Sequence, residues 1–557
     1  MKIKKSLLFN IGLAVLSATA IFLLSQTTFL KRAELTSRDI LFYLRGNIPF
    51  NPNIVIVEIT DADISGIGRW PWKRSWHAAM ARALNKLGAK SIYFDIIFSE
   101  SASEEDDAPL EEVMRLSKNV YLPFVFQDNA YDIKTALYPI KRFSSVVKDT
   151  GSINIHPDVD GTFRKIPLTF PAKKEIYQHI ALKIAMNYAD LEIKELKLNY
   201  LLLSNNKEQF KIPFTEKNTI LINWVGKWKS TFKHYSFLDV LAAYNDVLQN
   251  KKPGIDTNVF KNSICLVAAT AVGLYDIRSV PVQPEYPGIG IIATTISNIL
   301  NRDFLIPAPS WVSILLLYFL SLLPALLIFG EKPLRETIFT FLICGIYLTA
   351  SFIIFKNGIV LQLATPLLGL FTSSLIVGTY NFVHISAERQ KFFSMSITDG
   401  LTGLYNIRFF KQLVETDIKL EERRSGKKFC ILMTDVDHFK NFNDTYGHQV
   451  GDLVLKEISN ILKNSVRSSD IVARYGGEEM IILLRDASLK DSLIISEKIR
   501  KNVEAHLIKD NYKVTISAGL AAFKLGDDTE TIIKRADVGL YEAKQSGRNR
   551  VCSIEEN

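Results

Sequence analysis

The stretch from Ile471 to Leu484, IVARYGGEEMIILL, decides the fold of the last part of this 557-residue chain. It predicts two short strands, rich in β-branched and aromatic residues, joined by a turn at Gly476-Gly477-Glu478-Glu479, the pattern of a β-hairpin. The glycines allow a positive φ and leave the backbone open to a planar or phosphorylated ligand. Adjacent carboxylates at a tight turn repel each other, so we expect a cation beside them, and a divalent metal is the simplest candidate.

A second acidic segment precedes this hairpin. Phe429 to Thr434 is an apolar strand followed by Asp435-Val436-Asp437. Asp435 at the strand end, together with the hairpin carboxylates, would provide the oxygen ligands that Mg²⁺ prefers. Taken alone, Asp435 or Asp437 could equally cap a helix containing Phe439 to Asn443. The presence of two acidic sites favours the metal.

These segments resemble the GGDEF family of diguanylate cyclases over the whole of a domain that we place at residues 397–557. The matching segments are DGLTGLYNIR (Asp399–Arg408), TDVDHFKNFNDTYGHQVGD (Thr434–Asp452), RSSD (Arg467–Asp470), RYGGEEM (Arg474–Met480), ISAGLA (Ile516–Ala521) and ADVGLYEAKQSGRNRV (Ala536–Val551). The resemblance implies an α+β fold with a central antiparallel sheet, related to the polymerase palm and to class III nucleotide cyclases. The implied reaction condenses two GTP molecules to cyclic di-GMP and pyrophosphate.

The family's metal and catalytic residues transfer to matching positions. The resemblance implies two Mg²⁺ ions, with Mn²⁺ as an alternative. Asp435, the backbone carbonyl of Val436 and Glu478 match the ligands of one ion, and Glu479 lies at the other. The residues implied as catalytic are Asp435, Lys440, Glu478 and Glu479. Two metal ions would polarise the α-phosphate, activate the 3′-hydroxyl and offset charge on the leaving group.

The same resemblance implies a binding site for GTP. Asn443 and Asp452 match the pair that binds the guanine edge, whose donors and acceptors suit an amide and a carboxylate. The positions around the triphosphate are Phe439, Lys440, Lys544 and Arg548. Gly477 lies where a side chain would obstruct the nucleotide.

Lys544 and Arg548 are four residues apart in a predicted helix. Side chains at this spacing share one face, so both could supply positive charge to the phosphates. The alternative is a surface salt-bridge role, which the rest of the motif disfavours.

One domain holds one GTP and the reaction needs two, so the resemblance makes a homodimer part of the mechanism. Arg467 and Asp470 match a site at which the family binds its product, cyclic di-GMP, and is inhibited by it. The alternative is an ordinary surface ion pair. The sequence departs from the family at Met480, usually Phe, and at Ile407, usually Arg.

The composition indicates a membrane protein. Hydrophobic residues make up 48% of the chain, which is high for a soluble protein. Ser6 to Leu30 is an uncharged apolar stretch after several lysines, and we interpret residues 1–30 as an uncleaved anchor rather than a signal peptide. Further apolar runs are Trp311–Phe329, Ile338–Phe355 and Ile359–Val383, with breaks at 331–336 and 356–358.

Four crossings place both termini on the same side. The positive-inside rule puts residues 31–309 outside the cell's inner membrane, residues 310–383 in three membrane helices, and the cyclase domain in the cytoplasm. Residues 384–396 form a helical stalk, either a dimer contact or a simple linker. The net charge of +9 could indicate a nucleic-acid partner. We expect none, because the basic residues are not interleaved with aromatic residues. The scattered cysteines predict neither a disulfide in the outer segment nor a zinc site.

The outer segment predicts a parallel α/β sheet. Asn53–Thr60 and Ser91–Phe98 read as buried strands with a helix at Trp76–Leu87 between them, and further strands are expected at Asn119–Phe126, Thr219–Val225 and Ser263–Ala268. Three segments, Gly68–Glu100, Asn154–Leu168 and Pro287–Leu300, resemble the second variety of CHASE-type extracellular sensor. Asp61, Asp158 and Asp160 could form a calcium site, although a turn with solvated carboxylates is favoured.

The sequence therefore predicts a membrane-bound sensor diguanylate cyclase that responds to an unidentified outside signal. The alternative is a non-enzymatic receptor that binds GTP or cyclic di-GMP and signals to a protein partner. An adenylate cyclase is disfavoured because Asn443 and Asp452 suit guanine.

Overall fold

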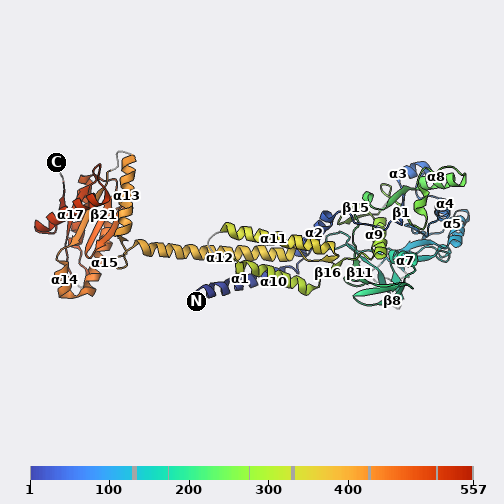
Figure 1. Cartoon of the computed structure of the whole chain (residues 1–557), viewed down its shortest axis with the longest axis horizontal. Coiled ribbons are helices and arrows are strands. Elements are labelled where there is room, and N and C mark those ends of the chain that lie inside the picture. Colours follow the sequence, from blue (N-terminus) through green and yellow to red (C-terminus); the bar gives the residue numbers. More distant parts are fainter. Residues whose placement is uncertain are drawn as a thin grey trace. The chain divides into compact units, whose positions relative to one another are not determined.

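The computed structural model describes residues 2–127, 135–172, 175–274, 276–327, 333–423, 428–509 and 512–554. The chain forms two compact units, Met1–Asn381 and Phe382–Asn557 (Figure 1). Of the predicted break at residues 331–336, residues 331 and 332 lie outside the described ranges, and residues 333–336 form the first turn of a helix, α11 (Pro333–Lys356), instead of a break.

The N-terminal unit contains a six-stranded sheet in the order β12-β1-β13-β2-β3-β4, and every neighbouring pair is parallel. Its strands are β1 (Ile54–Ile59), β2 (Ser91–Phe94), β3 (Val120–Phe124), β4 (Asp149–Ser152), β12 (Lys233–Ser236) and β13 (Ile264–Ala269). The inner strands β1 and β13 are apolar except for Glu58 of β1, because both faces of the sheet are covered, as is usual in parallel sheets.

Two hydrophobic cores lie on the two faces of this sheet. Side chains of α4 (Arg74–Lys86), α5 (Glu104–Ser117) and α8 (Phe237–Leu248) pack with Val55 and Val57 of β1. On the other face, α7 (Ile180–Tyr188) and α9 (Gly288–Asn301) pack with Ile54 and Ile56. The predicted strand-helix-strand unit is present as β1-α4-β2, with β13 inserted between its two strands.

The predicted strand at 219–225 is shorter and lies elsewhere. β11 (Thr219–Leu221) pairs antiparallel with β5 (Lys165–Pro167), outside the parallel sheet.

Further elements of this unit include α2 (Thr28–Arg45), α3 (Asp61–Ile67), α6 (Lys141–Ser144), β6 (Thr169–Ala172), β7 (Glu175–Gln178), β8 (Glu192–Leu196), β9 (Tyr200–Ser204), β10 (Gln209–Pro213), β14 (Ile277–Val280), β15 (Gln283–Pro287), β16 (Ile306–Pro307) and β17 (Ile359–Val360).

The acidic residues considered for calcium have other partners. The Arg164 guanidinium is buried and bonds Asp39, Asp158 and Asp160, at 2.6 to 3.2 Å. Asp61 lies at the start of α3, where its carboxylate accepts a hydrogen bond from the backbone N–H of Val272. Asp158 and Asp160 therefore form ion pairs with Arg164, and Asp61 bonds a backbone amide. These contacts argue against a calcium site formed by the three residues.

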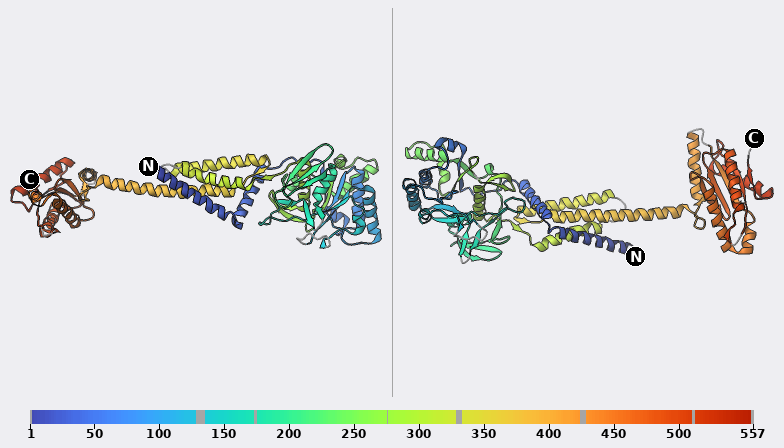
Figure 2. Two further views of the ribbon diagram at one scale, coloured as in Figure 1. Left: turned by 90° about the horizontal axis from the view of Figure 1, so that it is seen from below. Right: turned by 180° about the vertical axis from the view of Figure 1, so that it is seen from behind.

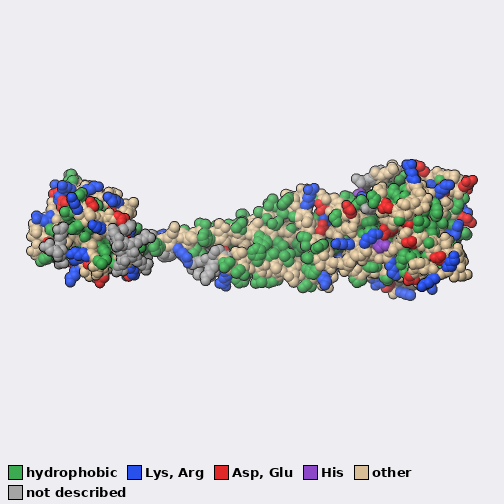
Figure 3. Space-filling view, turned by 90° about the horizontal axis from the view of Figure 1, so that it is seen from above, with side chains coloured by type: hydrophobic (Ala, Val, Ile, Leu, Met, Phe, Trp, Pro, Cys, Tyr) green, Lys and Arg blue, Asp and Glu red, His purple; other side chains and the backbone are tan. Residues whose placement is uncertain are grey.

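Four helices in the described part of the chain are long and apolar enough to cross a membrane. They are α1 (Lys2–Leu24), α10 (Ser310–Leu327), α11 (Pro333–Lys356) and α12 (Ala364–Ile397). They run side by side in the views of Figure 2, and Figure 3 shows hydrophobic side chains gathered over them. α1 packs on α10 and α12 through small clusters such as Ala14, Ala325 and Val377.

The first apolar stretch is shorter than predicted. α1 ends at Leu24 and a separate helix, α2, begins at Thr28, so a boundary at residue 30 falls inside α2. The hydroxyls of Ser25 and Thr27 donate to the carbonyls of Phe22 and Leu24, at 2.6 Å each, and so close the end of α1.

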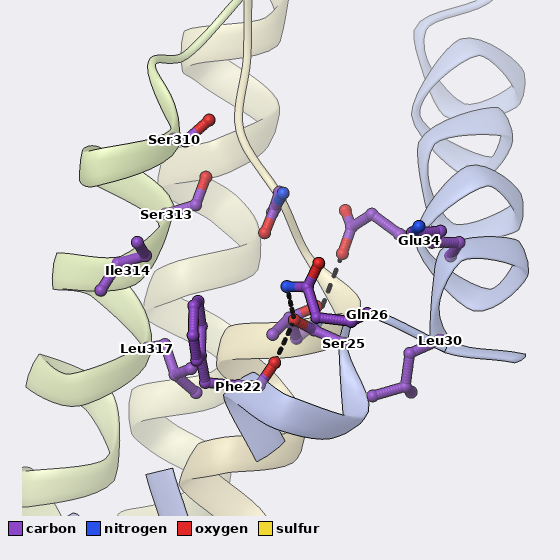
Figure 4. Close-up of a pocket in the computed structure, with 12 residues that line it drawn as sticks. Phe22, Ser25, Gln26, Leu30, Glu34, Ser310, Ser313, Ile314 and Leu317 are labelled. Carbon is purple, nitrogen blue, oxygen red and sulfur yellow. Dashed lines mark hydrogen bonds between the residues drawn. The ribbon is translucent and has the colours of Figure 1, made fainter. Parts of the chain in front are cut away.

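The last apolar helix, α12, continues without a break through the predicted stalk at residues 384–396. Its start is held by Glu34 of α2, whose carboxylate accepts hydrogen bonds from the backbone N–H groups of Leu363, Ala364 and Thr365. Figure 4 shows Glu34 at the edge of a cavity of about 270 Å³ that Ser25 also lines. A carboxylate at this position satisfies amides that a helix start leaves unpaired.

The C-terminal unit is built on a second six-stranded sheet, in the order β18-β20-β21-β19-β22-β23. The inner strands pair antiparallel and the two edge strands pair parallel. The strands are β18 (Tyr405–Asn406), β19 (Cys430–Val436), β20 (Ile471–Gly476), β21 (Glu479–Leu484), β22 (Ile516–Ala522) and β23 (Val551–Ser553).

Helices cover both faces of this sheet. One core joins it to α15 (His448–Ser465) and α16 (Leu489–Ala505), and the other joins it to α13 (Ile407–Arg423) and α17 (Thr529–Gln545). α14 (Phe439–Tyr446) follows β19. The Met480 side chain is fully buried against α15, where the Ser459 hydroxyl donates to its sulfur at 3.6 Å, and Ile407 packs against the other core.

Candidate functional site

The hairpin β20–β21 is tighter than the sequence predicted. Gly476 and Glu479 are paired across the strands, so the turn consists of Gly477 and Glu478 alone. Only Gly477 of the two glycines has a positive φ, at 53°. A Cβ added to Gly477 would meet no protein atom within 4 Å, so the space beside its backbone is open to a ligand.

Arg474 holds this turn and was not singled out from the sequence. Its Nε and Nη2 donate to the Gly477 carbonyl at 2.9 and 2.7 Å, and its Nη1 lies 3.2 Å from an Asp399 carboxylate oxygen. Asp399 in turn accepts from Thr402. The positions of Arg474 and Asp399 inside the two motifs were the available signal, because an Arg that bonds a turn carbonyl fixes the turn.

The strand carrying Asp435 brings this residue beside the hairpin. Asp435 lies within β19 rather than after it, and it pairs in register with Glu479 of β21. The Asp435 carboxylate is buried and lies 2.8 Å from the Lys544 ammonium. The structure therefore brings Asp435, Glu479 and Lys544 together at the hairpin end of the sheet.

The electrostatics of this group favour an additional cation. Burial raises the pKa of Asp435, and the Lys544 ammonium only partly offsets this effect. Burial and the neighbouring Asp435 carboxylate raise the pKa of Glu479. The carboxylates thus repel one another in a partly desolvated place, which is the condition that a bound metal relieves.

The donor set fits Mg²⁺, although no cluster of three or more metal-ligating side chains is found in the described part of the chain. Asp435 and Glu478 would provide two carboxylates and Val436 a carbonyl, and Mg²⁺ usually keeps several waters. Glu479 remains beside this set as a further acidic ligand. An oxygen-only set of this size matches a hard cation rather than zinc.

The prediction that Lys544 and Arg548 share a helix is wrong. α17 ends at Gln545, and Gly547 and Arg548 both have positive φ, at 109° and 61°. The Arg548 N–H bonds the Ala543 carbonyl at 3.0 Å, the hydrogen bond of a Schellman-type helix end. Arg548 is exposed in the following turn, so the two cations come from different local structures.

Asp437 fixes this turn, a role that the sequence did not reveal. Its buried carboxylate accepts hydrogen bonds from the hydroxyls of Thr515 and Ser517, at 2.7 and 2.6 Å, and from the Asn549 N–H at 3.0 Å. It does not cap α14, whose N-cap position is His438. Asp437 is therefore a positioning residue that joins the segment after β19 to the segment carrying Arg548.

The residues predicted to bind guanine lie on two adjacent helices. Asn443 is in α14 and Asp452 is exposed at the start of α15. A Cβ on Gly451 would lie 1.8 Å from the Asn443 Oδ1, so this glycine permits the two helices to approach. That Oδ1 is buried and has no hydrogen-bond partner among the described residues, which leaves an acceptor for a ligand donor.

The other predicted residues differ in accessibility. Phe439 is buried in the core beneath α14, and Lys440 beside it is exposed. The Asp470 carboxylate accepts from the backbone N–H groups of Arg467 and Arg485, at 2.9 and 3.1 Å, while the Arg467 side chain is exposed. Asp470 is thus used within the turn, and Arg467 is the more available of the two.

Two domains of known families match this chain. Residues 13–327 match the CHASE2 domain, and residues 396–550 match the domain described as "Diguanylate cyclase, GGDEF domain". The largely antiparallel sheet with an acidic hairpin fits the second description. The chain belongs to the family of CHASE2-domain proteins and carries a GGDEF domain after it.

Similar proteins match about a third of this chain. Diguanylate cyclase A of Treponema denticola is 37% identical over 193 residues, which is 34% of this chain and 52% of that protein. Response regulator PleD of Caulobacter vibrioides is 40% identical over 163 residues, 28% of this chain and 36% of that protein. The chain therefore spans about half or less of the length of these relatives.

A solved structure also aligns with this part. The coiled coil and GGDEF domain of DgcB from Caulobacter crescentus, in complex with c-di-GMP, is 29% identical, with a TM-score of 0.32. The alignment covers 33% of this chain and 99% of that structure.

Proposed function

We propose that this protein is a membrane-bound diguanylate cyclase that condenses two GTP molecules to cyclic di-GMP and pyrophosphate. The observation that carries the proposal is the group formed by Asp435, Glu479 and Lys544 beside the Gly477-Glu478 turn, inside a GGDEF domain. The relatives named diguanylate cyclase support the same reaction.

In this proposal the chain's own residues bind and orient GTP. The unpaired Asn443 Oδ1 accepts a guanine N–H, and Asp452 on the next helix accepts another. Lys440, Lys544 and Arg548 supply positive charge to the phosphates, and Gly477 leaves room for them. Phe439 supports this side of the site from the core.

Asp435, the Val436 carbonyl, Glu478 and Glu479 would hold two Mg²⁺ ions, with Mn²⁺ as an alternative. When bound, these ions polarise the α-phosphate and stabilise charge on the leaving pyrophosphate. Arg474 keeps the turn closed, and Asp437 keeps the Arg548 segment in place. Asp435, Lys440, Glu478 and Glu479 are the proposed catalytic residues.

The proposed enzyme acts as a homodimer, because one domain binds one GTP and the product contains two guanosine units. The continuous helix α12 supports this assembly, since residues 384–396 can extend the last apolar helix as a stalk. In the proposed topology, the four apolar helices span the inner membrane, residues 31–309 lie outside and the cyclase domain lies in the cytoplasm.

We also propose product inhibition through Arg467. Its exposed guanidinium can grip a guanine or a phosphate of cyclic di-GMP. Asp470 would act mainly by holding the turn that presents Arg467.

The activity is tested with the purified full-length chain in lipid vesicles, incubated with GTP and Mg²⁺ and analysed for cyclic di-GMP. Parallel samples contain ATP in place of GTP, or the Glu478→Ala variant. Cyclic di-GMP from the wild type alone supports the proposal. Binding of GTP without any product would favour the non-enzymatic receptor, and cyclic AMP from ATP would favour an adenylate cyclase.

A further inference from the structure

A cavity of about 160 Å³ lies in the CHASE2 domain, at the carboxyl ends of the parallel strands. Asp95, Val125 and Ile153 line it, and each directly follows a strand, namely β2, β3 and β4. Gly288 lines it from the first turn of α9. In open parallel sheets, ligands bind outside the carboxyl ends of the strands, so the position itself is that of a ligand site.

His179 supplies a buried hydrogen-bond donor to this cavity. The residue is fully buried and caps α7, where its Nδ1 accepts a hydrogen bond from the Ala181 N–H at 3.1 Å. Burial lowers the pKa of His179 to about 3, so the ring is neutral. Because Nδ1 is the acceptor, the proton is on Nε2.

That Nε2–H has no hydrogen-bond partner in the described part of the chain. A buried donor without an acceptor destabilises the ligand-free protein. An oxygen of a bound molecule would remove this cost, and His179 lines the cavity in which such a molecule would lie.

Asp95 is a carboxylate in the same cavity that needs a positively charged partner. It is partly buried, and the Tyr93 hydroxyl donates to its Oδ1 at 2.8 Å. Burial raises the pKa of Asp95 to about 6, which leaves most of the group ionised at neutral pH. No ion pair to Asp95 is found among the described residues.

The other two charged side chains that line the cavity leave the Asp95 carboxylate uncompensated. Arg278 and Asp276 line the same cavity, and their side chains bond each other at 2.6 Å. They neutralise one another, so the lining carries the net negative charge of Asp95. A positively charged group on a ligand would balance it.

The remaining wall is mainly apolar and the space is small. Its apolar residues include Ile153, Ile155, Ile166, Ile291 and Ile292, and Asn154 adds a polar side chain that already bonds the Phe126 backbone. The volume is below the roughly 300 Å³ of a drug-sized ligand pocket, so the cavity suits a compact molecule. The apolar wall, together with Asp95 and His179, orients such a molecule.

We propose that this cavity binds a small molecule carrying an ammonium group, an oxygen acceptor and a short apolar side chain, the chemistry of a free aliphatic amino acid. The ammonium pairs with Asp95, the oxygen accepts from the His179 Nε2–H, and the side chain lies on the isoleucine wall. The inference concerns binding alone and is independent of the cyclase activity.

The test uses the full-length chain in detergent and a panel of L-amino acids, with thermal shift and calorimetry as readouts. Matched probes separate the groups: an alkylamine without the carboxylate, a short carboxylic acid without the amine, and an N-acetylated amino acid. We expect an aliphatic amino acid to raise Tm and each single-group probe to bind at least about tenfold more weakly.

Two variants test the site directly. Asp95→Asn should raise Kd by at least about tenfold, and Ile292→Trp should block binding by filling the cavity. Asp239→Asn, on the exposed side of α8 at the other face of the sheet, should bind like the wild type. The free Tm of each variant reports whether it is folded.

Three outcomes would overturn the proposal: no amino acid binds the wild type, the alkylamine binds as tightly as the amino acid, or folded Asp95→Asn binds unchanged. Each measurement is made without GTP.

Discussion

The two six-stranded sheets of this protein place their polar groups in different ways. In the six-stranded sheet of the CHASE2 domain all neighbouring strands are parallel, so their carboxyl ends meet at one edge, and the residues directly after β2, β3 and β4 line one cavity. In the GGDEF domain the inner strands alternate in direction. Its acidic residues therefore come from one strand, β19, and one hairpin, β20–β21.

This difference decides what holds each site together. A hairpin places Glu478 and Glu479 by its own short turn, with Arg474 as the clamp. The cavity at the edge of the parallel sheet is formed by residues far apart in the chain, such as Asp95 and His179. Single substitutions at the hairpin should therefore change the reaction rate, whereas single substitutions at the cavity should change the affinity for its ligand.

The largest expected effect lies at the hairpin. Glu478→Gln removes a proposed metal-ligand charge and should lower kcat by about 10³-fold or more, in the range of removing a transition-state stabilising group. The rate of cyclic di-GMP formation at saturating GTP and Mg²⁺ measures it. Glu415→Gln, on the exposed face of α13, is the control and should keep wild-type activity. A loss smaller than tenfold would contradict the assignment.

The second effect is on stability. Asp437→Ala would leave the donors of Thr515, Ser517 and Asn549 without their acceptor, and should lower the free energy of unfolding of the GGDEF domain by about 2–4 kcal/mol. Denaturant unfolding measures it. Asp444→Ala, exposed on α14, should change it by less than about 0.5 kcal/mol. An equal change in the free energy of unfolding for both variants would show that Asp437 does not hold these two segments together.

The third effect concerns product inhibition. Arg467→Ala should raise the cyclic di-GMP concentration for half inhibition by about tenfold, the loss of one charged contact worth ~1.4 kcal/mol. Basal activity should stay unchanged. Lys463→Ala, also exposed and near the end of α15, is the matched control. An inhibition curve identical to the wild type would remove this role from Arg467.

The smallest effect tests the link between the two sheets. Glu34→Gln keeps one oxygen acceptor at the start of α12 and replaces the other with a donor that cannot satisfy the amides there. We expect a change of about two- to fivefold in basal cyclase activity in vesicles, equivalent to ≲1 kcal/mol. Thr36→Ala, exposed on the same helix, is the control. Unchanged activity would mean that this cap does not affect the cyclase.

The sequence predicted the hairpin, the acidic strand, the parallel β1-α4-β2 unit and the four apolar helices. These elements have strong hydrophobic patterns or special turn residues. β12 and β4 were missed because KHYS and DTGS are short and polar, and only their neighbours in the sheet define them as strands. The sequence did not reveal that α17 ends at Gln545, so Lys544 and Arg548 were wrongly placed in one helix.

The cavity could not be predicted because its polar residues lie far apart in the chain. Asp95, His179 and Asp276 meet only when the sheet and α9 are assembled. In isolation His179 is an ordinary buried histidine. Its Nε2, which has no hydrogen-bond partner among the residues that the structure describes, distinguishes it.

The bonds from Glu34 to the start of α12 have a thermodynamic consequence. α2 leads into the CHASE2 sheet, and α12 is one helix from Ala364 to Ile397. If ligand binding in the CHASE2 domain changes the affinity of the GGDEF domain for a nucleotide, the nucleotide must change the affinity for that ligand by the same factor. The concentration of GTP or cyclic di-GMP would then set how sensitive the protein is to its signal.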